Sequence, residues 1–373
     1  MAGRLSGLGA AVLAAALLCA RAGAPPGTVS DAGAASDAAG FQQAVPGRSF
    51  EFPRDHGPHP DFRHEWWYVT GNLDAADGER FGFELTFFRF ALVPPGAPPT
   101  PSAWRAREIY MAHFAVTDAA QRRFRFAQKL SRAALGLAGA GAEPLHVWID
   151  DWSLAQTAPD WQLQAAQPGY EVALTLSPQG APVLNGAAGL SEKSDDPADA
   201  NYYYSIPRVA VHGRLLRGTQ TLEVHGLAWL DREWGSGGLG AREEGWDWFA
   251  LQFDDGTALM FYALRDRGGG RDLHSAGTWI DAGNGTRALA NEDVAIAALA
   301  AWRNSDGARY PAAWRIRVPS LALDVGVRPV LADQELKTSP PYWEGAVNVS
   351  GTRAGRGVRG RGYVELVGYA QER

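Results

Sequence analysis

The chain has 373 residues, a net charge of −6 and an aromatic content of 11% that includes 14 Trp. This length exceeds what one hydrophobic core usually serves, so two domains are expected. The mild negative charge, spread along the chain, argues against nucleic acid as a partner.

The first residues have the pattern of an export signal. Arg4 supplies a positive start, Leu8 to Leu18 form a short apolar core, and small residues around Ala22 offer a cleavage site. We therefore predict a signal peptide over residues 1–24 and delivery to the periplasm or outside the cell. The only cysteine, Cys19, lies within this segment, so the mature chain would need no disulfide and have no thiolate.

Residues 25–48 are mostly small residues that bury little apolar surface, and they predict a flexible leader. No later apolar run is long enough to span a bilayer, so no integral membrane domain is expected.

From Phe50 onward, short apolar runs alternate with turn-forming residues. This alternation predicts an all-β protein of antiparallel barrels or sandwiches with few short helices. One such helix is expected near Asn291–Ala301, where acidic residues follow a capping residue. The predicted strands are Trp66–Leu73, Arg80–Leu92, Tyr110–Thr117, His146–Leu154, Trp161–Ala165, Tyr170–Leu176, Tyr202–Leu216, Gln220–Trp229, Trp246–Phe253, Ala258–Leu264, His274–Ile280, Trp314–Val318, Leu321–Val327, Tyr342–Gly351 and Gly362–Tyr369.

A loose internal repeat supports two similar domains. Glu65-Trp66 and Glu233-Trp234 each open a segment that leads to an aromatic hairpin ending in arginine. We place an N-terminal domain at residues 49–225 and a C-terminal domain at residues 226–373.

Common catalytic templates are missing from the sequence. It contains neither a Gly-x-Ser-x-Gly elbow nor a phosphate-binding Gly-Lys-Ser loop. Residues 55–65 are rich in histidine and carboxylate, which allows either a metal site or an entry loop that caps a barrel. We favour the cap and expect no metal or cofactor.

The segment from Gly226 to Gly235 is the leading candidate for chemistry. On a strand, Trp229, Asp231 and Glu233 point to one face and Leu230, Arg232 and Trp234 to the other. A carboxyl group desolvated on a barrel's inner wall keeps its proton near neutral pH and can act as a general acid. The structural alternative is an internal ion pair of Arg232 with Glu65 or Asp247.

Two aromatic clusters have the same ambiguity. Tyr203 and Tyr204 can either orient a ligand or pack in a core. Trp248, beside Asp247, can either stabilise positive charge or fill space.

Taken together, these segments resemble the carotenoid 1,2-hydratase and AttH-like proteins. The resemblance extends over about residues 50 to 370. The matching runs within it are His64–Leu73, Phe81–Arg89, Met111–Ala115, Tyr202–Ser205, Trp229–Gly235, Gly245–Gln252 and Tyr342–Val347.

The resemblance implies two lipocalin-like antiparallel β-barrels without metal or organic cofactor. Members of this family include carotenoid hydratases, predicted secreted hydrolases and catalysts of pericyclic ring closure. The hydratase pattern has a histidine beside the aspartate of the Trp229–Gly235 run, whereas this chain has Leu230. That departure argues against carotenoid hydration.

Two functions stay open at this point: an exported enzyme that hydrates or hydrolyses an apolar, isoprenoid or lipid-like molecule, and a carrier without chemistry. The expected catalytic residues are Asp231, Glu233, Arg232 and Tyr203. The expected substrate-binding residues are Glu65, Trp67, His113, Tyr204, Trp229, Asp247 and Trp248. The partner is an apolar small molecule, and the sequence predicts no oligomeric state.

Overall fold

The computed structural model describes residues 40–98, 106–240 and 242–370. The predicted signal peptide and most of the predicted leader fall outside these residues. The described part is almost entirely β-strand, and its only helices are the 3-10 turns η2 (Arg54–His56), η3 (Pro197–Asp199), η4 (Asn291–Asp293) and η5 (Pro319–Leu321). The predicted all-β class is therefore confirmed. No helix within the described residues is long and apolar enough to cross a membrane.

The N-terminal sheet has thirteen strands, all antiparallel to their neighbours. Its principal order is β4-β3-β2-β1-β13-β12-β9-β8-β7-β6-β5. The bounds are β1 (His64–Ala75), β2 (Arg80–Ala91), β3 (Glu108–Asp118), β4 (Arg123–Arg132), β5 (Ala138–Ala142), β6 (Leu145–Ile149), β7 (Trp152–Thr157), β8 (Asp160–Gln167), β9 (Tyr170–Pro178), β10 (Val183–Leu184), β11 (Leu190–Glu192), β12 (Ala200–Arg217) and β13 (Gln220–Gly235).

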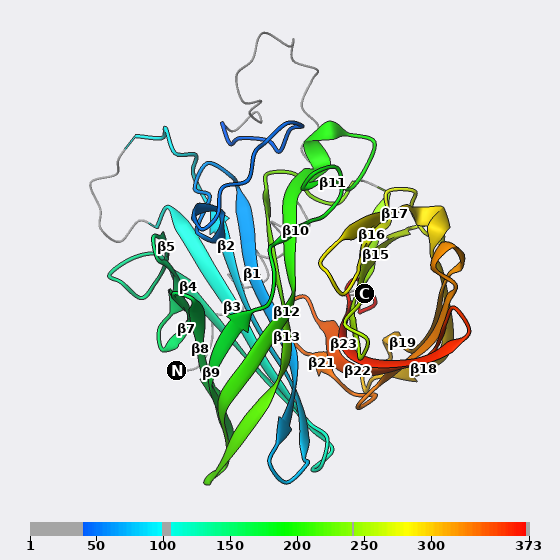
Figure 1. The fold of residues 1–373 in the computed structure, drawn as a ribbon. Coiled ribbons are helices and arrows are strands. Elements are labelled where there is room, and N and C mark those ends of the chain that lie inside the picture. Colours follow the sequence, from blue (N-terminus) through cyan, green and yellow to red (C-terminus); the bar gives the residue numbers. More distant parts are fainter. Residues whose placement is uncertain (1–39, 99–105, 241, 371–373) are drawn as a thin grey trace.

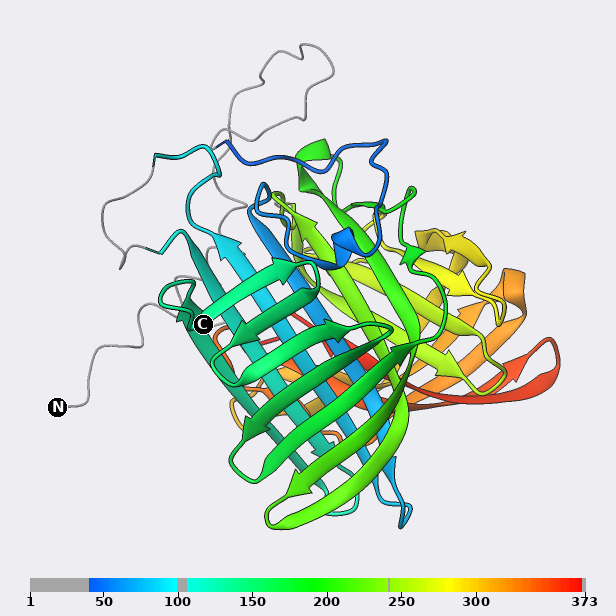
Figure 2. The same ribbon diagram turned by 60° about the vertical axis from the view of Figure 1, so that its left-hand side comes forward.

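This sheet bends over on itself, so that the short strands β5 to β9 lie across the layer of β1 to β4 (Figure 2). Large apolar side chains fill the space between the layers, among them Trp67, Phe83, Phe114, Trp152 and Leu163. Their alternation with outward-facing residues follows from the period of two along a strand.

The C-terminal sheet has ten antiparallel strands in the principal order β17-β16-β15-β14-β23-β22-β20-β19-β18. It curls into a nearly closed ring, seen end-on in Figure 1, around a core that includes Phe249, Trp314 and Val364. The bounds are β14 (Glu243–Phe253), β15 (Ala258–Asp266), β16 (Ala276–Ile280), β17 (Thr286–Leu289), β18 (Ala295–Arg303), β19 (Arg309–Val318), β20 (Leu323–Pro329), β21 (Glu335–Leu336), β22 (Tyr342–Arg353) and β23 (Arg356–Leu366).

Three sequence predictions need correction. The helix expected over Asn291–Ala301 is a single turn followed by β18, because pairing with β19 outweighs the high intrinsic helix propensity of the alanines. The strand expected over His146–Leu154 is the hairpin β6–β7, which turns at Asp150 with a positive φ of 52°. The boundary expected after residue 225 falls inside β13, which stays paired with β1 and β12, so the change of sheet comes between Gly235 and Glu243.

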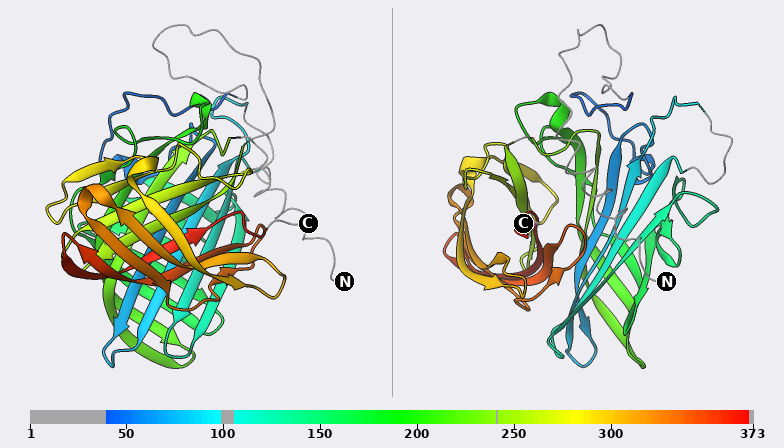
Figure 3. Two further views of the ribbon diagram at one scale, coloured as in Figure 1. Left: turned by 90° about the vertical axis from the view of Figure 1, so that its right-hand side faces the viewer. Right: turned by 180° about the vertical axis from the view of Figure 1, so that it is seen from behind.

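The two sheets pack against each other through their outer faces, as Figure 3 shows from two directions. Tyr68, Trp229, Trp248, Met260 and Tyr363 are buried in this contact. The backbones come close at Gly82, where an added Cβ would lie 2.6 Å from the Cβ of Ala346. The part of the first sheet's outer face that β1, β2 and β12 provide is therefore covered by the second sheet.

The inner face of β1 and β13 carries a buried ion-pair cluster. Glu65 accepts hydrogen bonds from Arg89 Nε at 2.5 Å and from Arg232 Nη2 at 2.9 Å, and all three side chains are inaccessible to solvent. Arg232 also lies over the ring of Trp67, 4.0 Å from its centroid. Although burial opposes ionisation, the two arginines hold the pKa of Glu65 well below its usual range.

Replacing Glu65 with Gln would leave the buried guanidinium group of Arg232 without a counter-charge, and would leave Arg89 with Glu108 alone, at 3.2 Å. We expect a loss of about 3–5 kcal/mol in unfolding free energy, measured by urea denaturation. The control Asp324→Asn breaks an exposed pair with Arg315 and should leave the unfolding midpoint nearly unchanged. Equal stabilities of Glu65→Gln and the unaltered protein would show that the cluster does not hold this barrel together.

Candidate active site

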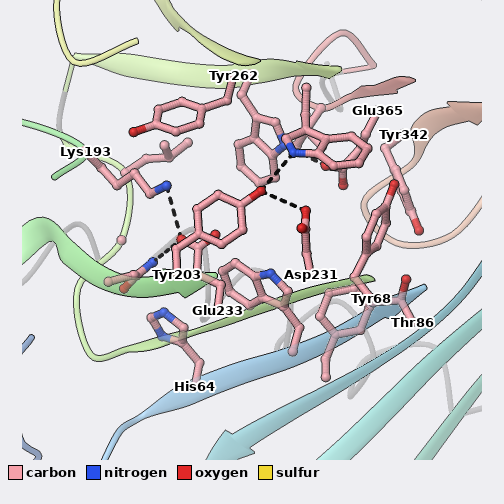
Figure 4. Close-up of a pocket in the computed structure, with 18 of the residues that line it drawn as sticks. His64, Tyr68, Thr86, Lys193, Tyr203, Asp231, Glu233, Tyr262, Tyr342 and Glu365 are labelled. Carbon is pink, nitrogen blue, oxygen red and sulfur yellow. Dashed lines mark hydrogen bonds and ion pairs between the residues drawn. The ribbon is translucent and has the colours of Figure 1, made fainter. Parts of the chain in front are cut away.

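The pocket lies between the two barrels and not inside either of them. Its floor is the outer face of β1, β2, β3, β12 and β13, and its roof is the outer face of β14, β15, β22 and β23 (Figure 4). This position corrects the expectation of an acid on a barrel's inner wall, because large side chains fill the barrel interiors. The apolar lining is Trp66, Phe88, Phe90, Met111, Leu239, Trp246, Trp248, Leu264 and Val367.

A row of polar side chains crosses the pocket floor from strand to strand. The strand registers pair Ser205 with Asp231, Asp231 with Tyr68, Tyr68 with Thr86, and Thr86 with His113. Residues directly opposite each other in neighbouring strands point to the same face. The fold thus aligns five polar residues that lie far apart in the sequence, and we call them the polar row.

Asp231 is the most tightly held member of the row. Its carboxyl group accepts hydrogen bonds from Tyr203 Oη at 2.7 Å, Ser205 Oγ at 2.5 Å and Trp229 Nε1 at 2.7 Å. Burial raises the pKa of Asp231 to about 7, although these three donors act in the opposite direction. A carboxyl group with this pKa is a competent proton donor near neutral pH.

A second layer fixes the donors around Asp231. Asn185 Nδ2 donates to Ser205 Oγ at 2.9 Å, and Thr278 Oγ1 of the second barrel donates to Asn185 Oδ1 at 2.9 Å. Trp248 Nε1, also from the second barrel, donates to Tyr203 Oη at 3.1 Å. Both sheets therefore orient the same carboxyl group.

Glu233 sits one step along β13 on the same face but in a different electrostatic setting. It forms an ion pair with Lys193 at 3.1 Å and accepts a hydrogen bond from Asn201 Nδ2 at 2.8 Å. Lys193 also lies over the ring of Tyr262, 4.2 Å from its centroid. Although burial opposes protonation, Glu233 raises the pKa of Lys193. Glu233 and Lys193 thus form an ion pair beside an acid whose pKa is raised to about 7.

Three further buried carboxyl groups gather on the other side of the pocket. Glu344 accepts a short hydrogen bond from Tyr68 Oη, Glu84 accepts one from Thr86 Oγ1 at 2.8 Å, and Glu365 accepts one from Trp246 Nε1 at 2.8 Å. Burial raises the pKa of Glu84 to about 8, that of Glu365 to about 7 and that of Glu344 well above its usual value. Glu84 lies beneath the lining, whereas the other two reach it.

The structure brings together some of the predicted site residues. Asp231, Glu233, Tyr203, His113 and Trp248 line the pocket. Trp229 lies in the interface between the sheets and donates to Asp231.

The other predicted residues lie elsewhere. Glu65, Trp67, Tyr204 and Arg232 face the interior of the first barrel, because the alternation along their strands turns them away from the pocket. Arg232 therefore pairs with Glu65, which was the structural alternative. Asp247 pairs with Arg265 at 2.6 Å and accepts from Tyr369 Oη at 2.9 Å, away from the pocket.

The histidine-rich segment of residues 55–65 packs over the first barrel. His56 Nδ1 is 2.7 Å from Tyr204 Oη, Asp55 pairs with Arg48 at 2.7 Å, and His59 stacks on Trp234. This arrangement matches the capping interpretation of the segment. Within the described residues, no three His, Cys, Asp or Glu side chains are placed to share a metal ion.

Sequence reasoning missed Tyr68, Lys193, Tyr342, Glu344 and Glu365. A period of two places Tyr68 on the same face as Trp66, so strand alternation alone was a usable signal for this residue. The other four reach the pocket only through the packing of the second barrel and the β11–β12 connection, which no local pattern reveals.

The raised pKa of Asp231 predicts a measurable pH dependence of stability. In the unfolded chain the pKa of this carboxyl group is close to its ordinary value of 3.8. Between about pH 4 and pH 7 the folded state therefore binds more protons than the unfolded state. The stabilisation is full below the unfolded pKa and is lost as the pH rises through the folded pKa. From pH 5 to pH 8 the unaltered protein should therefore lose a few kcal/mol of unfolding free energy that Asp231→Asn does not lose, measured by urea unfolding at both pH values. Parallel pH profiles would contradict the assignment.

Comparison with known proteins identifies the family to which this fold belongs. The profile of the AttH-like family matches residues 43–369. A crystal structure of a protein from Nitrosomonas europaea that is assigned as an AttH has a TM-score of 0.80 and 36% identity, with 89% of this chain and 100% of that chain covered. Kievitone hydratase from Nectria haematococca shares the fold, with a TM-score of 0.67 and 15% identity over 86% of this chain and 93% of its own.

Among curated proteins, the dehydratase asqC of Emericella nidulans is 26% identical over 237 residues. The match covers 55% of this chain and 60% of that protein, so the chain spans less than two thirds of its curated relative. Because the family profile covers nearly all the described residues, the chain belongs to the AttH-like family.

Proposed function

We propose that this protein is an exported enzyme that adds water to, or removes it from, a carbon–carbon double bond of an apolar small molecule. The substrate would lie between the two barrels. The observation that carries the proposal is a buried carboxyl group, Asp231, whose pKa is raised to about 7, that faces an aromatic pocket and is oriented by three donors. Titratable groups with such shifts concentrate at functional sites.

The residues suggest how hydration would proceed. Asp231 donates its proton to one carbon of the double bond and leaves a positive charge on the other. The electron-rich face of Trp248, which lines the pocket near Tyr203 and Asp231, stabilises that charge. A water molecule adds to the cationic carbon, and the carboxylate of Asp231 takes up the proton that this water releases. The net change is addition of one water, and dehydration is the reverse.

Tyr203 serves as the orienting residue in this scheme. Its hydroxyl donates to Asp231 and accepts from Trp248, which fixes the carboxyl group relative to the aromatic wall. Arg232, which was also expected to be catalytic, lies on the opposite face of β13 and pairs with Glu65.

The relatives support chemistry of this kind without defining the substrate. A dehydratase is a distant sequence relative, and a hydratase uses the same fold. Because one fold hosts many reactions, these names support the proposal only together with the geometry of the pocket. Hydrolysis of a lipid-like ester and hydration of a carotenoid stay within the range to be tested.

Carriage of an apolar ligand without reaction is the second candidate. The observation that favours it is the predominantly apolar and aromatic pocket wall, together with the ion pair that engages Glu233. A carrier needs no proton donor, so the two functions differ in what Asp231 does.

The test is turnover of a panel of isoprenoid alkenes, carotenoids, tertiary alcohols and lipid-like esters by the purified protein in isotopically labelled water. We expect a mass gain or loss of one water, and Asp231→Asn should reduce the rate roughly a hundred- to ten-thousand-fold through loss of the general acid.

The control variant is Asp118→Asn, which alters a buried aspartate of β3 that pairs with Arg217 outside the pocket. It should keep the rate of the folded protein. Equal rates in Asp231→Asn and the unaltered protein would remove Asp231 from the mechanism. An unchanged lipid at one equivalent in solvent extracts, with no turnover of any substrate, would favour the carrier.

A further inference from the structure

The polar row ends in a second group of side chains that the proposed mechanism does not use. His113, Tyr68 and Glu344 line the pocket beyond Asp231. We propose that His113 and Glu344 form a binding site for a neutral oxygen atom of the ligand, either a carbonyl or a hydroxyl oxygen. This inference deepens the proposed function by naming the ligand class, but the binding itself does not depend on proton transfer by Asp231.

Unpartnered polar atoms are the first evidence for this site. His113 Nε2 and Glu344 Oε2 are inaccessible to solvent and have no hydrogen-bond partner among the described residues. His113 is 1% exposed and Glu344 is 0% exposed. A buried polar atom without a partner carries a desolvation cost, which a bound ligand atom can remove.

The hydrogen-bond partner of His113 defines what its free nitrogen offers. Nδ1 lies 2.7 Å from Tyr342 Oη, whereas the same hydroxyl is 3.4 Å from Glu84. Burial raises the pKa of Glu84 to about 8, so its protonated carboxyl group can donate to Tyr342 Oη, and that hydroxyl can then donate to Nδ1. In this tautomer the ring proton of His113 resides on Nε2. Burial lowers the pKa of His113 to about 3, so the imidazole is neutral. In this tautomer His113 presents its unpartnered Nε2–H to the pocket as a donor, and an acceptor atom of a ligand would satisfy it.

The charges around this site favour a neutral ligand. Glu65 and Asp247 are each paired with arginine, but no cation is paired with Glu84, Glu344 or Glu365 among the described residues. Burial raises the pKa of all three acids, which favours their neutral forms more strongly than in an exposed glutamate. A carboxylate ligand would meet no positive charge here, and an ammonium ligand would require the acids to ionise within an apolar wall.

The order of the strands sets the separation between Asp231 and His113. Asp231 and His113 lie on β13 and β3, with β1 and β2 between them. Neighbouring strands are about 4.8 Å apart, so the two backbones are separated by roughly 14 Å. Since both side chains project into the same pocket, the ligand oxygen would lie on the order of 10 Å from the reacting carbon. This spacing fits an apolar chain or ring system with an oxygen function at one end.

The test compares three probes that share one isoprenoid skeleton. They are geranylacetone, the hydrocarbon with a methylene in place of its carbonyl, and the matching primary amine. Binding is followed by quenching of tryptophan fluorescence, because Trp66, Trp246 and Trp248 line the pocket. We expect the ketone to bind about five- to tenfold more tightly than the hydrocarbon, the range for one added hydrogen bond to a buried donor.

Two variants separate this inference from the proposed function. His113→Leu should bring the ketone-to-hydrocarbon affinity ratio close to one, because the ketone loses its hydrogen bond to the ring. Asp231→Asn should keep the ratio, even where it abolishes turnover. Circular dichroism of each variant controls for folding.

Three outcomes would overturn the inference: equal affinities for ketone and hydrocarbon in the unaltered protein, tighter binding of the amine, or an unchanged ratio in His113→Leu. None of them bears on whether Asp231 transfers a proton. Conversely, a protein that shows the expected ratio but turns over nothing would be a selective carrier.

Discussion

The chemistry of this protein depends on the burial of one sheet's outer face beneath a second barrel. The outer face of an antiparallel sheet is normally wet and polar. Here β14, β15, β22 and β23 cover it, and Tyr68, Trp229 and Tyr203 are almost inaccessible to solvent. Ionisable groups on that face are therefore controlled by desolvation and by their immediate neighbours, and not by bulk water.

Two buried acids on adjacent strands show how decisive those neighbours are. Glu65 faces the interior of the first barrel, where Arg89 and Arg232 keep it ionised. Asp231 faces the opposite side, where only uncharged donors reach it, and its pKa rises to about 7. Similar burial thus produces a structural anion in one place and a proton donor in the other. The difference lies in whether an arginine is present to compensate the charge.

Much of the fold was predictable because strand signals are local. Alternation assigned Asp231 and Glu233 to one face and Arg232 and Trp234 to the other, and the structure has this arrangement. Which face binds a ligand was not predictable, because the answer depends on the packing of the second barrel. The polar row was equally hidden, since it requires the registers of five strands between residues 64 and 235. His113 entered the predicted site only through family resemblance.

The chain passes from one sheet to the other at a single place, between Gly235 and Glu243. The floor of the pocket precedes this crossing and the roof follows it, so each half of the gene encodes one wall. Two fragments made by cutting the chain there would each lack a complete pocket. Any function recovered from the fragments would then depend on their concentration, as in a heterodimer whose active site spans the subunit interface.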